Sequence, residues 1–327
     1  MFNGQCSLNI VCATDNNFVQ HCCVMLVSVL MNNEDVTVYL LTEGLTPDNE
    51  RIISEEVTAR GGKVHFCIVD PTVIDRFPMP SGAELAHISR ATYYRLLIPE
   101  LLPREVGKVL YLDCDIVVNH SIADLWNIDL TGYALAAVPS VGFGREAARL
   151  GYPMEYGYFN AGVTLINVDY FRQHDVSRKL MEYIASNYDH IKFHDQDTLN
   201  AVLYDQYLHL EAQWNMTPNV YDSDYPQHGD RVDGRMVNDY AADKRNALAH
   251  KADPTIVHFA SHPKPWQRNC VHPLYHLYYD YAGQTLHFSH LRPQSILTRG
   301  WAIVIYRVRK QLSALKQRVR RYLIAKA

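Results

Sequence analysis

The sequence lacks several features that would assign it to a common protein class. No hydrophobic run is long enough to span a bilayer, and the first residues lack the basic start of a signal peptide. The seven cysteines are odd in number and show no CxxC spacing, which argues against a disulfide framework or a zinc site. A phosphate-binding GxxxxGK[ST] loop is also missing. These absences favour a protein of the reducing cytosol that is not a P-loop enzyme.

Acidic residues are missing from the end of the chain. No Asp or Glu follows Asp280, whereas ten Lys and Arg residues do. Residues 1–280 hold 21 basic and 35 acidic residues, a net charge of −14, and residues 281–327 carry +10. This asymmetry predicts a division into a body, 1–280, and a tail, 281–327, that meets an anionic partner.

The tail has the pattern of a basic amphipathic helix. Apolar residues recur at spacings of three and four, and basic residues fill the remainder. The apolar positions are Ile305, Val308, Leu312, Leu315, Val319 and Tyr322. Such helices bind anionic membrane surfaces. The alternatives are packing on the acidic body or a nucleic-acid contact. The last would need base-stacking aromatics among the basic residues, and only Trp301, Tyr306 and Tyr322 are present, so we expect no nucleic acid.

Strands and helices alternate through the first part of the chain. Apolar runs at 8–13, 36–41 and 64–69 are typical of strands, and the segments 19–31 and 47–61 are typical of helices. This order predicts an α/β fold with a mostly parallel sheet. In such sheets, ligands bind beyond the carboxyl ends of the strands.

The later segments are more varied. Asp195 stands near the start of one expected helix, and helix capping alone would explain an aspartate there. The elements that we expect are a helix at 90–97, strands at 133–138, 158–167 and 256–259, one long amphipathic helix from 170 to about 188, a helix from 194 to 204, and a polar functional loop at 215–250.

The apolar run at 109–118 contains two carboxylates, Asp113 and Asp115. Burying an unpaired charge is costly, so the pair is expected where this strand leaves the core. Side chains alternate along a strand, so both carboxylates point one way and Cys114 points the other way. Hard oxygen ligands of this kind suit Mg²⁺ or Mn²⁺. The alternative is an acidic pair at a solvated strand end.

Two further segments suggest a nucleotide. Asp15, Asn17 and Phe18 follow the first strand and offer hydrogen bonds and a stacking face to a base. Lys264 follows the last strand and offers a point charge for phosphate. Metal, diphosphate and base together describe a nucleotide or a nucleotide-sugar. The first strand does not lead into a glycine-rich turn, which disfavours a dinucleotide fold.

Six motifs in order give the chain a family resemblance from about residue 8 to 275. They are residues 13–18 (ATDNNF), 92–96 (TYYRL), 108–115 (KVLYLDCD), 159–163 (FNAGV), 195–200 (DQDTLN) and 258–266 (H-x5-KPW). In these motifs the chain resembles the family 8 glycosyltransferases, and especially the bacterial lipopolysaccharide galactosyl- and glucosyltransferases. The resemblance implies a single GT-A catalytic domain over 1–280 and transfer of a hexose with retention of configuration.

The resemblance also assigns roles to individual residues. It implies that Asp113, Asp115 and His258 bind Mn²⁺, with Mg²⁺ as the alternative, and that Asp195 and Gln196 are catalytic. The implied UDP-sugar-binding residues are Ala13, Asp15, Asn17, Phe18, Arg95, Asp113, Cys114, Asp115, Asn160, Ala161, Asp195, Gln196, His258, Ser261 and Lys264. Ser261 stands where relatives usually carry glycine.

The implied donor is UDP-galactose or UDP-glucose, and the implied acceptor is lipopolysaccharide or another surface glycan, offered as a glycolipid or oligosaccharide. A lipid-linked acceptor would place the enzyme on the inner face of the bacterial cytoplasmic membrane, held there by the tail. The alternatives are a protein or soluble acceptor, or a nucleotidyltransferase that makes nucleotide-sugars. The latter would need a glycine-rich, basic loop after the first strand, and none is present.

Overall fold

The computed structural model describes residues 7–74, 90–140, 143–221, 231–232, 235–236, 240–260, 263–293, 295, 300–301, 303–305 and 308. The strands are β1 (Leu8–Ala13), β2 (Val36–Thr42), β3 (Lys63–Ile68), β4 (Lys108–Leu112), β5 (Ile116–Val118), β6 (Leu135–Pro139), β7 (Phe159–Asn167), β8 (Tyr207–His209), β9 (Arg231–Val232), β10 (Arg235–Met236) and β11 (Ile256–His258).

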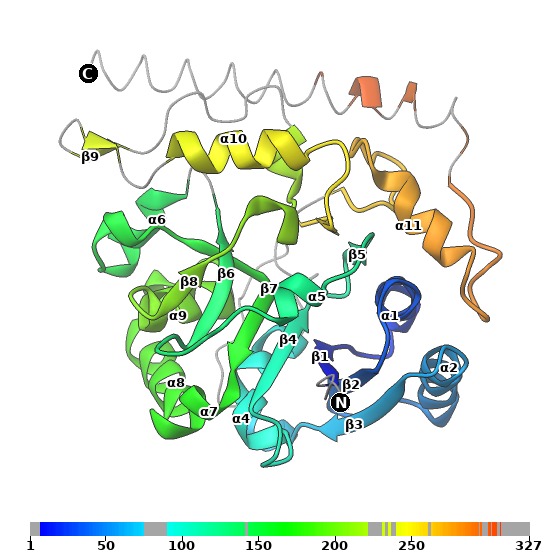
Figure 1. Ribbon diagram of the computed structural model, residues 1–327, viewed down its shortest axis with the longest axis horizontal. Helices are drawn as coiled ribbons and strands as arrows, with labels where there is room; N and C mark the ends of the chain where they lie inside the picture. The colour runs from blue at the N-terminus through cyan, green and yellow to red at the C-terminus, as the bar shows by residue number, and fades with distance from the viewer. Residues whose placement is uncertain are drawn as a thin grey trace, which may run out of the picture.

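The helices alternate with these strands over much of the chain (Figure 1). The α-helices are α1 (Val19–Asn32), α2 (Pro47–Thr58), α3 (Pro71–Ile74), α4 (Ile98–Leu101), α5 (Ala123–Trp126), α6 (Gly144–Leu150), α7 (Val168–Gln173), α8 (Val176–Asn187), α9 (His194–Leu203), α10 (Tyr240–His250) and α11 (Tyr275–Ala282). The 3₁₀ helices are η1 (Arg90–Leu97), η2 (Met154–Tyr156), η3 (Tyr188–His190), η4 (Ala212–Trp214) and η5 (Pro218–Tyr221).

The central sheet has seven strands in the order β3-β2-β1-β4-β7-β6-β8. Neighbours are parallel except where β7 pairs with β4 and β6. The chain passes outward from β1 to β3 and then returns to β4 on the other side of β1. This reversal is a topological switch point between β1 and β4, and open α/β sheets bind their ligands beyond the carboxyl ends of the strands at such a point. The expected α/β fold with a mostly parallel sheet is confirmed.

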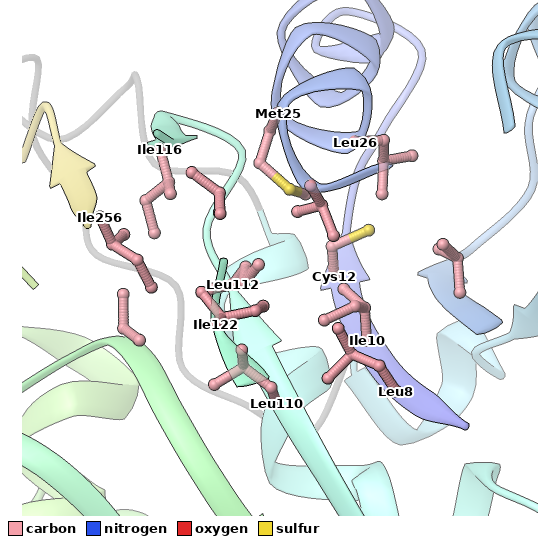
Figure 2. Packing of buried hydrophobic residues seen from close by; sticks show 14 of the residues in the cluster. Leu8, Ile10, Cys12, Met25, Leu26, Leu110, Leu112, Ile116, Ile122 and Ile256 are labelled. Atoms are coloured by element: carbon pink, nitrogen blue, oxygen red, sulfur yellow. The ribbon is translucent and has the colours of Figure 1, made fainter. Parts of the chain in front are cut away.

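Side-chain alternation in the sheet divides the core into two layers. Leu8, Ile10 and Cys12 of β1 pack towards Met25 and Leu26 of α1 (Figure 2). Val11, on the opposite face of β1, belongs to the other apolar cluster, which includes buried residues of η1, α8 and α9. Because successive side chains of a strand point to opposite faces, both layers are supplied by the same short strands.

Three expectations about secondary structure are wrong. The single helix expected from 170 to 188 is two helices, because Asp175 adopts a left-handed φ of 51° between α7 and α8. The run 109–118 is not one strand: β4 ends at Leu112, and β5 leaves the central sheet to pair with β11. The expected loop 215–250 contains α10, whose described side chains show no strong apolar stripe to indicate it.

The residues on both sides of the expected boundary at 280 are tied to the N-terminal helices. In α11, Tyr278 contacts Gln20 and His21 of α1 through its hydroxyl group. Glu56 of α2 is fully buried and accepts hydrogen bonds from the backbone N–H groups of Leu286 and His287, at 2.7 and 3.0 Å. The expected boundary at 280 therefore falls within α11, and it stays a prediction.

Only part of the expected tail helix lies in the described residues. Residues 300–301, 303–305 and 308 are helical, and Trp301, Val304, Ile305 and Val308 are each about half exposed or more. The other expected apolar positions, Leu312 to Tyr322, lie outside the described residues. Among the helices that the structure describes, none has the length and apolar character needed to cross a membrane.

Candidate active site

The sharp turn after β4 places two carboxylates at the switch point. Asp113 donates its backbone N–H to Gly162 O at 2.9 Å, which holds the end of β4 against β7. Phe259 donates its backbone N–H to Asp115 O at 2.9 Å, so β11 lies beside the turn. This pairing brings His258 to the carboxylates from a distant part of the chain.

Asp113, Asp115 and His258 form a compact group, here called the carboxylate cluster. One ligand atom from each residue lies within 4.8 Å of the other two. His258 Nε2 is 3.2 Å from Asp115 Oδ1 and 3.8 Å from Asp113 Oδ2. Two carboxylates and one imidazole nitrogen suit Mn²⁺ or Mg²⁺ in chemical type.

Gly162 lies directly against the side chains of His258 and Asp113 in the carboxylate cluster. A Cβ atom at this position would lie 2.2 Å from His258 Cε1 and 2.6 Å from Asp113 Oδ2. Any larger residue would therefore push two of the three candidate ligands away. The missing side chain of Gly162 thus makes room for the side chains that would hold the metal. The residues present thus fit a divalent metal.

Lys264 and Cys114 complete the surroundings of this turn. Lys264 Nζ donates to Asp115 Oδ2 and, at 2.8 Å, to Phe259 O. Burial alone would raise the pKa of Asp115, but Lys264 and His258 outweigh it and hold this pKa well below its usual range. Cys114 donates to Ala13 O at 3.2 Å, while a hydrogen bond with Cys22 and burial raise its thiol pKa. Cys114 is therefore a neutral thiol turned towards β1.

Arg95 of η1 links the carboxylate cluster to helix α9. Its guanidinium lies 2.7 Å from Asp113 Oδ1 and 2.7 Å from Asp195 Oδ2, and it donates to Ala161 O at 2.6 Å. It also lies over the ring of Tyr111, 4.1 Å from the centroid. Burial would lower the pKa of Arg95, but the two carboxylates raise it above its usual value. Arg95 is therefore a buried cation whose position is fixed by Asp113, Asp195 and the backbone of Ala161.

Asp195 does not cap α9. Its Oδ1 accepts from Thr92 Oγ1 at 2.6 Å and its Oδ2 faces Arg95, so the carboxylate is held from the η1 side. The chain enters α9 through His194, which adopts a left-handed φ of 50°. Burial raises the pKa of Asp195, although Arg95 and Thr92 oppose it. The capping interpretation of this residue is therefore wrong.

Gln196 lies at the centre of a group of neutral polar side chains. Its Oε1 accepts from Asn160 Nδ2 and from the backbone N–H of Ala161, both at 3.0 Å. Its Nε2 donates to Tyr158 Oη at 2.8 Å. Asn215 Nδ2 donates to Asn160 Oδ1 at 2.8 Å. We call Tyr158, Asn160, Gln196 and Asn215 the amide network.

Four residues near the site were missed by sequence analysis. Asn215 is only 3% exposed and accepts from His258 Nδ1 at 2.9 Å. Tyr158 donates to the buried carboxylate of Asp197 at 2.8 Å, and Arg149 Nη2 lies 2.9 and 3.0 Å from the two oxygens of that carboxylate. An asparagine between Trp214 and Met216 is a weak sequence signal of a buried polar role. For Tyr158, Asp197 and Arg149, residue spacing gives no signal that distinguishes them from other polar residues of the chain.

The residues expected to contact a base lie after β1. Asp15 Oδ1 accepts from the backbone N–H of Asn17 at 2.8 Å, and Asn17 and Phe18 are exposed. Behind them, His21 stacks on Trp266 with ring centroids 3.7 Å apart. Trp266 follows Lys264, so this stack supports the loop that carries the lysine. Ser261 lies outside the described residues.

The expected site residues that the structure describes fall into three neighbouring groups at one edge of the sheet. They are the carboxylate cluster with Lys264, the network around Arg95, Asp195 and Gln196, and the residues after β1. This position, beyond the carboxyl ends of β1 and β4, is where open α/β sheets bind their ligands, as the resemblance to the GT-A glycosyltransferases implies.

Comparison with known proteins gives the same assignment. The chain belongs to glycosyltransferase family 8, because the model of that family, "Glycosyl transferase family 8", matches residues 9–270. General stress protein A of Bacillus subtilis is 31% identical over 284 residues, which cover 85% of this chain and 94% of that protein.

Other relatives carry more specific descriptions. Glycosyltransferase GlyF of Streptococcus pneumoniae is 28% identical over 273 residues, covering 84% of this chain and 61% of that protein. Among solved structures, the galactosyltransferase LgtC in complex with donor and acceptor sugar analogs is 27% identical, with a TM-score of 0.75. That match covers 85% of this chain and 96% of LgtC.

Proposed function

We propose that this glycosyltransferase transfers galactose or glucose from a UDP-sugar with retention of configuration, and that it requires Mn²⁺. The observation that carries the proposal is the carboxylate cluster with Lys264 at the switch point of the sheet. Asp113, Asp115 and His258 would hold the metal. When bound there, Mn²⁺ would act as a Lewis acid on the departing diphosphate.

The protein's own residues supply the remaining functions. Lys264 offers an ammonium group that offsets the negative charge growing on the diphosphate. Arg95 fixes Asp195, and with it the start of α9, relative to the carboxylate cluster. Phe18, exposed after β1, offers a face for the uracil ring, with Asp15 and Asn17 beside it.

Within the proposed retaining reaction, the way both candidate catalytic residues are held favours one route over a covalent intermediate. Both carboxylate oxygens of Asp195 are engaged, by Thr92 and Arg95, and the side chain is 4% exposed. Gln196 presents an amide and not a carboxylate. With no free nucleophile from these two residues, attack by the acceptor hydroxyl on the face that UDP leaves is the favoured retaining route. NMR of the anomeric proton should show an α product, and a β product would exclude the proposal.

A saccharide acceptor is supported by exposed aromatic rings beside Gln196. Phe143 stacks on Tyr158 with centroids 6.0 Å apart, and Phe193 meets Phe143 edge-on at 6.1 Å. Phe143 and Phe193 are 36% and 41% exposed. Since Tyr158 bonds to Gln196, these rings offer apolar faces next to the reacting centre. We propose a glycolipid or oligosaccharide acceptor.

Attachment to the cytoplasmic face of a membrane is supported by the tail. Trp301, Val304, Ile305 and Val308 follow helical spacing and are 48–72% exposed, in a segment without acidic residues. Exposed apolar side chains, in a segment whose sequence is rich in basic residues, fit an anionic lipid surface. On this reading the catalytic body, residues 1–280, acts on lipid-linked sugars at that surface.

A thermal-shift panel tests the donor and the metal together. The full chain is melted with UDP-glucose, UDP-galactose and their N-acetyl forms, each with and without Mn²⁺. The true donor should raise the melting temperature more with Mn²⁺ than without it. At a donor concentration of a hundred times Kd, donor binding should stabilise the folded state by about 2.7 kcal/mol. A shift with GDP- or CMP-sugars and none with the UDP-sugars would exclude the proposed donor.

A further inference from the structure

The carboxylate cluster and Gln196 are joined by an unbroken series of side-chain hydrogen bonds. Each side chain in the series donates to the next one. The order is His258 Nδ1 to Asn215 Oδ1 at 2.9 Å, Asn215 Nδ2 to Asn160 Oδ1 at 2.8 Å, Asn160 Nδ2 to Gln196 Oε1 at 3.0 Å, Gln196 Nε2 to Tyr158 Oη at 2.8 Å, and Tyr158 Oη to Asp197 Oδ1 at 2.8 Å.

Two backbone groups and one carboxylate fix the direction of this series. Gly162 N–H donates to Asn160 Oδ1, and Ala161 N–H donates to Gln196 Oε1, both at 3.0 Å. A backbone N–H can only donate, so both amides must present their oxygens to β7 and their NH₂ groups away from those oxygens. At the far end, the carboxylate of Asp197 accepts from Tyr158.

The fixed direction determines the tautomer of His258. The oxygen of Asn160 accepts from Asn215 Nδ2, so the oxygen of Asn215 faces His258. His258 must then carry a proton on Nδ1, which leaves Nε2 as the ring nitrogen available to a metal. Nε2 is the atom that lies 3.2 Å from Asp115 Oδ1. A histidine held in this way is prepared to bind a metal, because ring rotation and the other tautomer are both disfavoured.

We propose that Asn215 is a positioning residue that couples the metal site to the donor-sugar face, which is formed by Asn160 and Gln196. Its oxygen sets the tautomer of His258, and its NH₂ group sets the amide plane of Asn160 and, through it, that of Gln196. Asn215 suits this role because it is 3% exposed and bonds to both groups. This inference rests on the proposed function, its metal half on the Mn²⁺ site and its sugar half on the UDP-sugar.

Two substitutions separate the two halves of this role. Asn215→Leu keeps the number and branching of the side-chain heavy atoms and removes both hydrogen bonds. Asn215→Asp keeps an acceptor for His258 Nδ1–H but replaces the donor to Asn160 with a second oxygen. The matched control is Asn246→Leu. Asn246 Oδ1 accepts from the backbone N–H of Ala212 at 2.8 Å, so it anchors the same turn, η4, without contacting the site.

Mn²⁺ binding to the full chain, measured by electron paramagnetic resonance without nucleotide, reads the metal half. Asn215→Leu should raise the Mn²⁺ dissociation constant by about 10- to 100-fold, the usual loss when the partner of a ligating histidine is removed. Asn215→Asp should stay within about threefold of the wild type, because carboxylates serve the same purpose in such sites. Asn246→Leu should bind as the wild type does.

Turnover of the UDP-sugar at saturating Mn²⁺ reads the sugar half. Asn215→Asp should lower kcat by about tenfold or more with little change in the KM for the donor, because Asn160 and Gln196 lose their preset orientation. Asn246→Leu should keep the wild-type kcat.

Several outcomes would overturn the inference. Unchanged Mn²⁺ affinity in Asn215→Leu excludes the role at the metal, and unchanged kcat in Asn215→Asp excludes the coupling. Equal losses in Asn246→Leu would assign the effect to the folding of η4. If the wild type binds Mn²⁺ but turns over no UDP-sugar, the proposed donor fails while the metal half is still tested.

Discussion

The carboxylate cluster and the amide network meet at residues 160–162 of β7, but their side chains are held in place by different forces. In the carboxylate cluster, two acidic side chains and an imidazole lie within 4.8 Å and are balanced by Lys264 and Arg95. In the amide network, every group is neutral, and one arrangement of protons satisfies all of the hydrogen bonds. Charge therefore dominates one region, and hydrogen-bond direction dominates the other.

This difference determines how each region should respond to substitution. Removing a charge changes what the carboxylate cluster can bind. Removing an amide that does not contact His258 leaves the neighbouring groups able to turn, so binding survives while alignment is lost. The first region, together with Asn215, should therefore control metal affinity, and the rest of the second region should control turnover.

The largest effect is expected for Asp115→Asn. Transfer should fall by about a thousandfold or more, because loss of the metal removes several kcal/mol of transition-state stabilisation. Steady-state rates at saturating UDP-sugar measure it, and circular dichroism checks folding. The control is Asp253→Asn, whose 71% exposed carboxylate pairs only with His120 and Asn119 among the described residues. Full activity in Asp115→Asn would remove the metal role, and an unfolded variant would favour a structural one.

Gly162→Ala should break the carboxylate cluster without removing any ligand. The new methyl group would meet His258 Cε1 at 2.2 Å and Asp113 Oδ2 at 2.6 Å. We expect Mn²⁺ binding and transfer to fall about a hundredfold, with a loss of about 1–3 kcal/mol in stability from overpacking. Calorimetry with Mn²⁺ measures the first effect. In Gly283→Ala the added Cβ has only ordinary contacts at 3.4 Å, and this control should behave as the wild type does.

Gln196→Ala tests whether the amide network controls turnover without controlling UDP affinity. Transfer should slow by about 10- to 100-fold, because Asn160 and Tyr158 lose the amide that aligns them. The affinity for UDP with Mn²⁺ should stay near normal, since the carboxylate cluster is unchanged. Gln206→Ala, which removes an amide bonded to Tyr170, serves as the control. Loss of UDP affinity equal to the loss of rate would contradict the division between the two regions.

Acid should weaken the packing of His21 against Trp266, behind the residues after β1. Burial lowers the pKa of His21 to about 4, with Asp115 opposing this shift and Lys264 adding to it. The folded protein thus binds this proton less well than the unfolded chain does, so stability is complete above pH 6.5 and declines as pH falls towards 4. We expect a loss of about 2 kcal/mol by pH 5, measured by urea unfolding.

His21→Gln supplies the comparison for this pH effect. It should show a shallower pH dependence over the same window, although the buried His272, whose pKa burial lowers to about 3, contributes a similar term in both proteins. An identical pH dependence in wild type and variant would remove His21 from the explanation.

The smallest effect on the site is expected from removing the tail. A chain ending at Pro293 keeps the bonds between Glu56 and residues 286–287 and should transfer sugar to a short, lipid-free acceptor at the wild-type rate. Binding of the full chain to anionic vesicles should be lost in this chain. Sedimentation with vesicles at several salt concentrations measures it, because surface attraction is screened over about 10 Å at 0.1 M salt.

Arginine substitutions test the same tail without truncation. Replacing Arg318, Arg320 and Arg321 with Gln should weaken vesicle binding by about 1 kcal/mol for each residue. The control replaces Arg51 and Arg178 with Gln, two exposed arginines of the body. A much lower melting temperature of the truncated chain would instead assign the tail to the core.

The main sheet could be predicted because its strands are short apolar runs between clear helix signals, such as Thr46, whose side chain caps α2. The carboxylate cluster could be expected because charges inside an apolar run need a partner. The break between α7 and α8 could not, because it depends on Asp175 adopting a left-handed conformation that its sequence neighbours do not require.

The amide network was beyond prediction for a related reason. Gln196 was identified only by resemblance, and Asn215 was not identified at all. An asparagine makes hydrogen bonds in almost any setting, and its role depends on which atoms the fold brings within 3 Å. Backbone groups of Ala161 and Gly162 set those directions, and a sequence does not show where backbone N–H groups point.

The pairing of β5 with β11 bears on the order in which the molecule folds. Lys264 follows Asp115 by 149 positions, and β11 reaches the turn after β4 only when most of the chain has been made. Contacts so distant in sequence form slowly, because a long loop must close first. A cation bound by Asp113, Asp115 and His258 would hold only the state in which this closure is complete. Metal capture would then report on the last stage of folding, when the newly made enzyme becomes competent.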